Sequence, residues 1–228
     1  MDAPNAKINI LYRDEHILVT YKPYGVLSEG DEQKPNMPAL LREEIGCRDV
    51  YTVHRLDRTT QGLMAYALTT EAAKRLSALV QKGEMEKIYL TVAEGTPETP
   101  AGELSDLLYF DRRKNKSYVV KRERKGVKEA RLCYETLDTV KLDGKTLSLL
   151  KIRLLTGRTH QIRVQFASRK MPLVGDRRYG STVESDNILL CSSQLRFTHP
   201  FSGEELHFAY LPDNGIFSCF DMQKLTCS

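Results

Sequence analysis

The chain has 228 residues, and its 34 Lys and Arg exceed its 30 Asp and Glu, which gives a formal net charge of +4. A chain of this length buries a sizeable core, and 41% hydrophobic with 28% charged residues excludes disordered and fibrous proteins. No apolar run approaches the roughly 18 residues of a membrane-spanning helix, and the first ten residues lack the pattern of a secretory signal.

The cysteines are five in number, scattered, and never arranged as Cys-x-x-Cys. This pattern argues against a disulfide framework and against a zinc knuckle. Because free thiols persist in a reducing compartment, we expect a cytoplasmic protein. The cysteines are Cys47, Cys133, Cys191, Cys219 and Cys227.

The N-terminal half of the chain alternates short strands with two helices. Residues 70–82 form the clearest predicted helix, because their apolar positions follow the 3.6-residue period and Gly83 suits its end. The other elements that we expect are strands at 8–12, 16–21, 62–68 and 86–94, a helix at 38–45 with proline in its first turn and Gly46 after it, and a loop at 95–103.

The C-terminal half contains one strong turn signal. Asp143-Gly144, between the runs 130–140 and 145–155, predicts a β-hairpin with a two-residue turn. Farther along, we expect Thr159 to cap a helix that ends near Lys170.

The order of these elements indicates the fold class. Hairpins and helices are mixed and do not repeat as βαβ, so we expect an α+β fold with a mixed, largely antiparallel sheet flanked by helices. No linker divides the chain, which predicts a single catalytic domain over residues 1–228, and nothing suggests an oligomer, so a monomer is expected.

Positive charge is concentrated in two segments. Residues 153–178 hold seven Lys and Arg with one acid, Asp176. Clustered cations with interleaved aromatic side chains are typical of a nucleic-acid partner, although a single charged run is often only a solvated face. The larger segment, residues 111–131, holds ten cations: Arg112, Arg113, Lys114, Lys116, Lys121, Arg122, Arg124, Lys125, Lys128 and Arg131.

Two polar constellations are able to carry chemistry. In the first, Asp57 lies between Arg55 and Arg58 just before an apolar strand, and the nearby cations favour its ionised form. Such a carboxylate serves as a nucleophile, a general base or a stabiliser of positive charge, or only as a local cap.

The second constellation opens the helix expected after Thr159. Arg158 and Arg163 are five residues apart and therefore leave the helix start on different faces, one toward solvent or phosphate and one inward to a carboxylate. The alternative is a basic amphipathic helix with an internally satisfied His160.

Several enzyme classes lack their sequence signals here. The chain contains no Gly-x-Ser-x-Gly elbow, no paired histidines of a zinc site, and no glycine-rich phosphate loop. What is left is a reaction that needs no cofactor and no metal and that depends on an acid and positioned arginines.

These segments resemble the RluA-type pseudouridine synthases. HRLDRTTQGL, from His54, is similar to the catalytic-aspartate motif of that family, and LLTGRTHQIRV, from Leu154, to its C-terminal motif. Four further segments resemble family segments in the same order: ILVTYKPYGVL, EKIYLTVAEG, KGVKEARLCYETL and PLVGDRRYG.

The resemblance implies isomerisation of uridine in RNA to pseudouridine in a catalytic cleft across the sheet. It makes Asp57 the catalytic aspartate, places Tyr89 against the flipped uracil, pairs Arg163 with Asp57, and inserts Arg55 where the base leaves its stack. Attack on the sugar C1′, attack on uracil C6 and removal of a sugar proton all remain open. The residues expected to contact RNA are His54, Arg55, Arg58, Arg158, His160, Arg112, Arg113, Lys114 and Lys116.

The chain departs from the family pattern at three positions. Gln61 stands where serine is usual, Gln165 where histidine is frequent, and Tyr21 where aspartate is frequent. No S4-like RNA-binding domain is expected in front of the catalytic domain.

Three alternatives stay open from the sequence. Ribosomal RNA is the favoured target, with transfer RNA as the alternative. A non-catalytic RNA-binding or assembly factor, and a hydrolase that uses Asp57 and His160, are the others.

Overall fold

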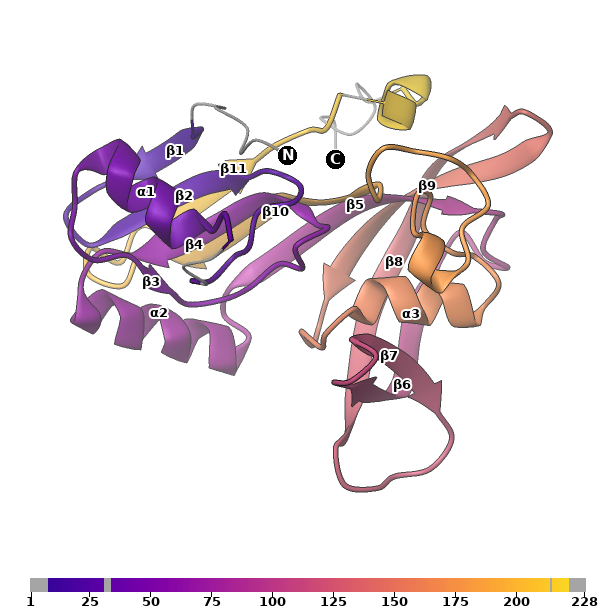
Figure 1. Cartoon of the computed structure of the whole chain (residues 1–228), viewed down its shortest axis with the longest axis horizontal. Coiled ribbons are helices and arrows are strands. Elements are labelled where there is room, and N and C mark those ends of the chain that lie inside the picture. The colour runs from indigo at the N-terminus through magenta and orange to yellow at the C-terminus, as the bar shows by residue number, and fades with distance from the viewer. Residues whose placement is uncertain (1–7, 31–33, 214, 222–228) are drawn as a thin grey trace. The chain divides into compact units, whose positions relative to one another are not determined.

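The computed structural model describes residues 8–30, 34–213 and 215–221 (Figure 1). The chain forms two compact units. The first comprises the described residues up to Lys87 together with Ser192–Tyr210, and the second comprises Ile88–Cys191 together with the described residues from Leu211 onward. Each unit has its own buried hydrophobic cluster, and the expectation of one catalytic domain over 1–228 stays a prediction.

The first unit is built on antiparallel strand pairs. β2 pairs with β1 on one side and with β4 on the other, β3 adds to β4, and β11 pairs with β10. The strands are β1 (Ile10–Arg13), β2 (Ile17–Lys22), β3 (Tyr51–Thr52), β4 (Gln61–Ala67), β10 (Leu190–Thr198) and β11 (Glu205–Ala209).

Both helices of this unit begin and end at residues with clear capping chemistry. In α1 (Met37–Ile45) the Asn36 side chain accepts from the Ala39 N–H, and in α2 (Thr70–Lys82) the Thr69 hydroxyl accepts from the Ala72 N–H. Gly46 and Gly83 follow the two helices in the left-handed conformation. The predicted helices are therefore confirmed.

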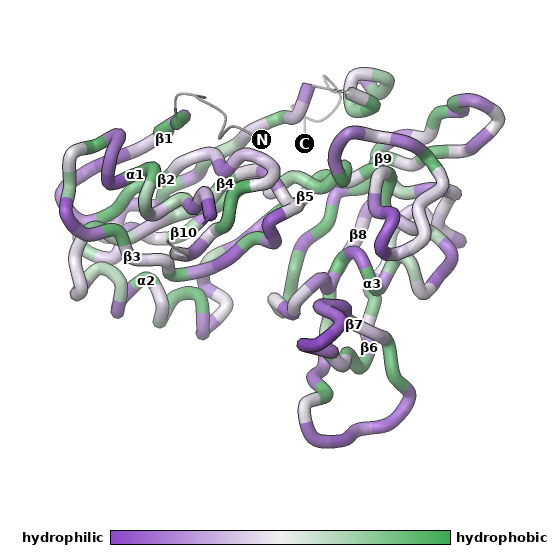
Figure 2. Tube along the Cα trace, in the orientation of Figure 1, coloured by the Kyte–Doolittle hydropathy of each residue, from purple (hydrophilic) through white to green (hydrophobic). Residues whose placement is uncertain are grey.

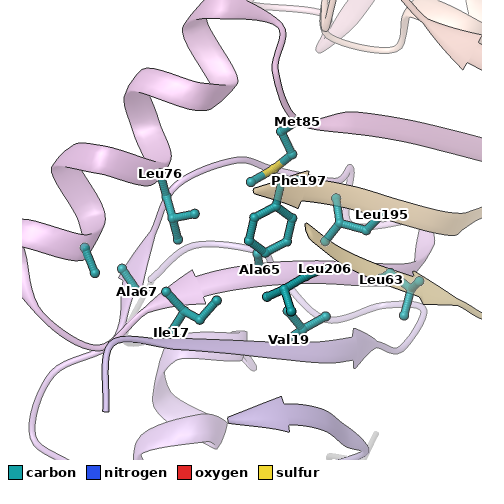
Figure 3. Packing of buried hydrophobic residues seen from close by; sticks show 11 residues of the cluster. Ile17, Val19, Leu63, Ala65, Ala67, Leu76, Met85, Leu195, Phe197 and Leu206 are labelled. Carbon is teal, nitrogen blue, oxygen red and sulfur yellow. The ribbon is translucent and has the colours of Figure 1, made fainter. Parts of the chain in front are cut away.

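The core of the first unit lies between α2 and its strands (Figure 3). Leu76 of the helix packs toward Ile17, Ala65 and Phe197, which come from three different strands and are all at most 2% exposed. Alternate residues of β2 and β4 supply this face, as expected of strands with a period of two. This packing fixes where β4 begins, directly after the Asp57 segment.

The second unit is built on five antiparallel strands in the order β5-β9-β8-β6-β7. Its elements are β5 (Glu86–Glu94), β6 (Ala101–Asp111), β7 (Lys116–Val120), β8 (Val127–Leu142), β9 (Lys145–Leu154), α3 (Gln161–Ser168) and two short 3₁₀ turns, η1 (Arg177–Tyr179) and η2 (Gly215–Cys219). The first residues of β5 belong to the other unit.

Turn chemistry sets the hairpins of this unit. Asp143 and Gly144 have φ of 48° and 76°, so the predicted two-residue turn between β8 and β9 is confirmed. The expected loop at 95–103 is shorter than predicted, because β6 begins at Ala101. The β6–β7 hairpin was not predicted, since its turn and the loop after β7 are dense in charge and hide the strand alternation.

The loop after β7, residues 121–126, extends from the end of the hairpin and is strongly hydrophilic (Figures 1 and 2). All six of its residues are exposed. Its cations are Lys121, Arg122, Arg124 and Lys125.

The expected cap of α3 is wrong. The helix starts after His160, which has a φ of 56° and makes no side-chain cap hydrogen bond. Thr159 instead has its carbonyl bound by the Ser117 hydroxyl at 2.6 Å, and the Gln161 side chain accepts from the Arg158 N–H at 3.0 Å. α3 also ends at Ser168, before the expected Lys170.

The α+β class with a largely antiparallel sheet is confirmed by these elements. In the part of the chain that the structure describes, no helix is long and apolar enough to cross a membrane. Four described cysteines are free thiols, and Cys227 lies outside the described residues.

Candidate active site

The loop that carries Asp57 is fixed at both neighbours of this residue. The Ser28 hydroxyl accepts from the Leu56 N–H at 3.0 Å and lies 2.7 Å from the Leu56 carbonyl. On the other side, the Gly25 N–H donates to the Arg58 carbonyl at 2.9 Å, and Arg58 Nε donates to the Gly25 carbonyl at 2.8 Å. Asp57 itself is partly buried, so a rigid backbone presents a carboxylate with limited solvent access.

The glycine at the end of the Asp57 motif is required by packing. Gly62 has a φ of 119°, and a Cβ at this position would lie 2.4 Å from the carbonyl oxygen of Ser192. Only glycine permits this approach of the two backbones. The start of β4 is therefore held against Ser192, a fixed distance after Asp57.

Lys22 is the buried cation of the first unit. Its side chain is fully buried, and its ammonium donates to the carbonyls of Pro23 at 2.9 Å and Val26 at 2.8 Å. Burial lowers the pKa of Lys22 to about 7, and the charge of Asp57 opposes this shift. In the sequence, Lys22 stood out only as a member of the segment ILVTYKPYGVL.

The arginines that flank Asp57 have partners in the neighbouring loop. Arg55 donates to Glu29 at 2.6 Å, and both side chains are exposed. Arg58 binds Gly25, as described above, and its charge lowers the pKa of Lys22. The lysine, which the sequence analysis overlooked, is thus a cation whose charge interacts with Asp57.

His54 lies in the interior and not on the surface. Its Nε2 accepts from the Ala65 N–H at 3.0 Å, and burial lowers the pKa of the imidazole to about 3. The ring is therefore neutral, with the proton on Nδ1, and among the described residues Nδ1 has no hydrogen-bond partner. Its expected contact with RNA gains no support from this position.

Arg163 and Asp176 form a buried ion pair in the second unit. Arg163 Nε and Nη2 donate to the two carboxylate oxygens of Asp176 at 2.6 and 3.0 Å, and the side chains are only 4% and 1% exposed. Asp176 follows Gly175, where a Cβ would lie 2.3 Å from the Asn187 carbonyl oxygen. The close approach at Gly175 thus places the carboxylate.

This pair confirms that Arg158 and Arg163 point in different directions. Arg163 turns inward to a carboxylate, whereas Arg158 is exposed and its Nε donates to the Glu129 carbonyl at 2.8 Å. The carboxylate found is Asp176, which the sequence analysis counted only as the single acid of a basic segment. The expected pairing of Arg163 with Asp57 joins residues of two units and stays a prediction.

Tyr89 belongs to the second unit, where it lies on β5 opposite Ile152 of β9. Its side chain is 5% exposed. A buried phenol on a strand is suited to hold a flat ring against a rigid wall. Its expected place beside a flipped uracil stays a prediction.

The cations of the basic β6–β7 turn differ in their surroundings: three are exposed, and Lys116 is bound to a backbone carbonyl. Asp111 accepts from the backbone N–H groups of Arg113 and Lys114 at 2.9 and 3.1 Å, so its carboxylate shapes the turn. The side chains of Arg112, Arg113 and Lys114 are exposed, and within the described residues none has a recorded ion pair. Lys116 differs, because its ammonium donates to the Arg178 carbonyl at 2.8 Å.

Two of the three departures from the family pattern, Gln61 and Gln165, are buried, and the third, Tyr21, is partly buried. Gln165 is fully buried, and its amide nitrogen donates to Asp106 at 2.8 Å, which ties α3 to β6. Gln61 is 5% exposed at the start of β4, and Tyr21 packs against Tyr210 with ring centroids 4.5 Å apart.

In the described parts of the chain, no group of three His, Cys, Asp or Glu side chains is placed to hold a metal ion.

Two solved structures of human proteins share this fold. Human RNA Pseudouridylate Synthase Domain Containing 1 has a TM-score of 0.79 at 22% identity and covers 95% of this chain and 88% of its own. Human RNA Pseudouridylate Synthase Domain Containing 4 has a TM-score of 0.74 at 22% identity, with 96% and 93% covered. The fold is thus that of pseudouridylate synthase domains.

The sequence relatives define the family. Residues 16–168 match the model of the RNA pseudouridylate synthase family. The tRNA pseudouridine synthase C of Vibrio parahaemolyticus is 32% identical over 220 residues, with 88% of each chain covered. The dual-specificity RNA pseudouridine synthase RluA of Escherichia coli is 30% identical over 210 residues, with 87% of this chain and 90% of the relative covered. The chain belongs to the RNA pseudouridylate synthase family.

The family membership also defines the activity in general terms. The protein is an RNA pseudouridine synthase, as the motifs around Asp57 and Arg163 predicted.

Asp176→Ala should lower the free energy of unfolding by about 3–5 kcal/mol, because it leaves the buried guanidinium of Arg163 without its carboxylate. Urea denaturation of the wild type and the variant measures the difference. Glu103→Ala is the matched control, since it removes the carboxylate of an exposed arginine pair with Arg131 and should change stability little. Equal effects of the two substitutions would contradict the structural role of the buried pair.

Lys22→Met should change how stability depends on pH. The lysine titrates at 10.5 in the unfolded chain and at about 7 in the folded one, so between these values the unfolded state binds more protons. The free energy of unfolding of the wild type should therefore rise with pH relative to the variant, by up to about 1.4 kcal/mol per pH unit. Urea titrations across this window measure it. Lys74→Met, at an exposed site on α2, should leave the profile unchanged, and a flat Lys22 difference would contradict the shift.

Proposed function

We propose that Asp57 is the catalytic carboxylate that converts uridine in structured RNA to pseudouridine. The observation that carries this proposal is the position of Asp57 between two neighbours, Leu56 and Arg58, whose backbones are fixed by hydrogen bonds. A carboxylate fixed in this way loses little conformational freedom when it meets the substrate. Attack on C1′, attack on C6 and removal of a sugar proton each require one such group.

The other residues of the site divide the remaining tasks. In the proposed mechanism Tyr89 lies against the extruded uracil and Arg163 pairs with Asp57, while Asp176 holds the guanidinium of Arg163 from its other edge. Arg55 enters the gap in the stack, which its exposed position on the loop permits. We assign His54 to the support of β4 and not to RNA contact, because its ring is buried and neutral.

We propose transfer RNA as the first substrate to test. Three tRNA pseudouridine synthase C proteins of Vibrio species are among its relatives, at 29–32% identity, which shifts the preference from the ribosomal RNA favoured by the sequence alone. The relative RluA of Escherichia coli is a dual-specificity enzyme, so we keep ribosomal RNA, the target favoured by the sequence, as the second substrate to test. We further propose that the protein works in the cytoplasm as a monomer and needs no cofactor or metal.

Release of tritium from RNA that carries [5-³H]uridine tests the proposal. The wild type should release tritium from transfer RNA, and Asp57→Ala should lower the rate about a thousandfold or more, as is typical when an essential catalytic group is removed. Asp49→Ala, at an exposed aspartate of the same unit, is the matched control and should remain active. Ribosomal RNA in a parallel reaction identifies the second target.

Two outcomes would overturn the assignment. Release that survives Asp57→Ala would remove this residue from catalysis. Release from ribosomal RNA with none from transfer RNA would reverse the preferred substrate.

The basic β6–β7 turn should supply phosphate contacts. Neutralising Arg112, Arg113 and Lys114 to Gln should weaken RNA binding and reduce the slope of log affinity against log salt by about 2–3, because each phosphate contact releases roughly one counterion. Filter binding over a range of salt concentrations measures this slope. The same substitutions at Lys121, Arg122 and Lys125 test the exposed loop separately. An unchanged affinity and slope in the Arg112, Arg113 and Lys114 variant would contradict the contact.

A further inference from the structure

Tyr179 lies at the centre of a contact network in the second unit that the reaction chemistry does not explain. Its hydroxyl accepts from the Ser117 N–H at 2.8 Å, lies 3.2 Å from the Ser117 carbonyl, and is 3.0 Å from His160 Nδ1. Ser117 is the second residue of β7, directly after the basic turn, and is 1% exposed. The phenol oxygen therefore joins η1 to the start of β7 and to the residue before α3.

The ring of Tyr179 contacts two cations. The Arg163 guanidinium carbon lies 5.1 Å from the ring centroid, and Lys116 Nζ lies 5.0 Å from it. An aromatic face attracts cations at this distance, and more strongly where water is excluded. Because Arg163 is only 4% exposed and one edge of it is bound by Asp176, the ring adds a constraint on the orientation of the guanidinium.

The basic turn is attached to η1 by more than the phenol. Lys116 Nζ donates to the Arg178 carbonyl at 2.8 Å, and Arg178 Nη1 donates back to the Lys114 carbonyl at 3.0 Å. The Ser117 hydroxyl also donates to the Thr159 carbonyl. The position of the turn therefore depends on the segment that contains Tyr179, and the start of α3 depends on the turn.

We propose that Tyr179 is a positioning residue that couples the basic turn to Arg163. Its hydroxyl holds the turn that presents Arg112, Arg113 and Lys114, and its ring holds the guanidinium of Arg163. The inference rests on the proposed function, because it gives Arg163 a role in the reaction and the turn a role in RNA binding. The position of RNA bound at the turn is thereby linked to the position of Arg163, the side chain proposed to pair with Asp57.

Two substitutions of Tyr179 separate the role of its hydroxyl from the role of its ring. Tyr179→Phe removes the hydroxyl that anchors the turn and keeps the ring over Arg163. Tyr179→Leu removes both the hydroxyl and the ring, and keeps the ion pair of Arg163 with Asp176. If the side chain only filled space, Tyr179→Phe would leave the kinetics unchanged, because phenylalanine fills nearly the same volume.

Steady-state tritium release from transfer RNA measures the division. Tyr179→Phe should raise KM about three- to tenfold, the effect of one lost hydrogen bond, and change kcat less than about twofold. Tyr179→Leu should also lower kcat about tenfold or more, since Arg163 loses a desolvated cation–π contact. Tyr134→Phe and Tyr134→Leu are the matched controls, because the Tyr134 hydroxyl bonds Thr99 on an exposed part of the same unit.

A second measurement does not depend on the leucine variant being folded. In a protein whose Arg112, Arg113 and Lys114 are replaced by Gln, Tyr179→Phe should raise KM no further, because the hydroxyl acts through the turn. Additive effects of the two changes would overturn the coupling. So would equal losses of kcat in the phenylalanine and leucine variants, or unchanged kinetics in both.

The failure of this inference is distinct from the failure of the proposed function. A wild type that releases no tritium from any cellular RNA contradicts the function itself. An active wild type with insensitive Tyr179 variants contradicts only the coupling.

Discussion

The cost of keeping charge away from water is the constraint on which this structure depends. Arg163 retains its charge in an interior position, so the second unit must supply a carboxylate, and Asp176 provides both oxygens in a paired geometry. The position of Asp176 in turn depends on the glycine before it, because only a residue without a Cβ lets the loop approach the Asn187 carbonyl so closely. A single buried guanidinium thus determines the path of the chain between α3 and η1.

The first unit meets the same constraint with a lysine. The ammonium of Lys22 is surrounded by carbonyls of the turn that it stabilises, and the charge of Asp57 compensates for part of its desolvation. Each unit therefore has a buried cation with polar partners: Lys22 is bound by carbonyls of its own turn, and Arg163 by a carboxylate from the segment after α3. The site residues are held by electrostatics as much as by apolar packing.

Local features of the sequence were sufficient for elements whose ends are set by short-range chemistry. The helices α1 and α2 and the Asp-Gly hairpin were predicted because glycines, a proline and the apolar period mark them. The β6–β7 hairpin was missed because charge obscures its alternation. The start of α3 was misplaced because His160, in the left-handed conformation, separates Thr159 from the first residue of the helix.

The candidate site residues also differ in whether the sequence alone was sufficient to find them. Asp57 and Arg163 were found from motif resemblance, whereas Asp176, Lys22 and Tyr179 acquire their importance only from the tertiary contacts that surround them. His54 was assigned to the RNA surface because it is polar and lies in the motif. Its neutral, buried ring shows that membership in a motif does not establish contact with a substrate.

The acid of the basic turn has a consequence for the rate of encounter with RNA. Asp111 directs its carboxylate to backbone amides and not to the neighbouring guanidinium and ammonium groups, so the turn keeps its shape without a counter-ion from its own side chains. The positive potential there extends into solvent and attracts polyanions over about a Debye length before any contact forms. Under the proposed role of this turn in RNA binding, a net charge of only +4 is sufficient for long-range steering of RNA toward the turn.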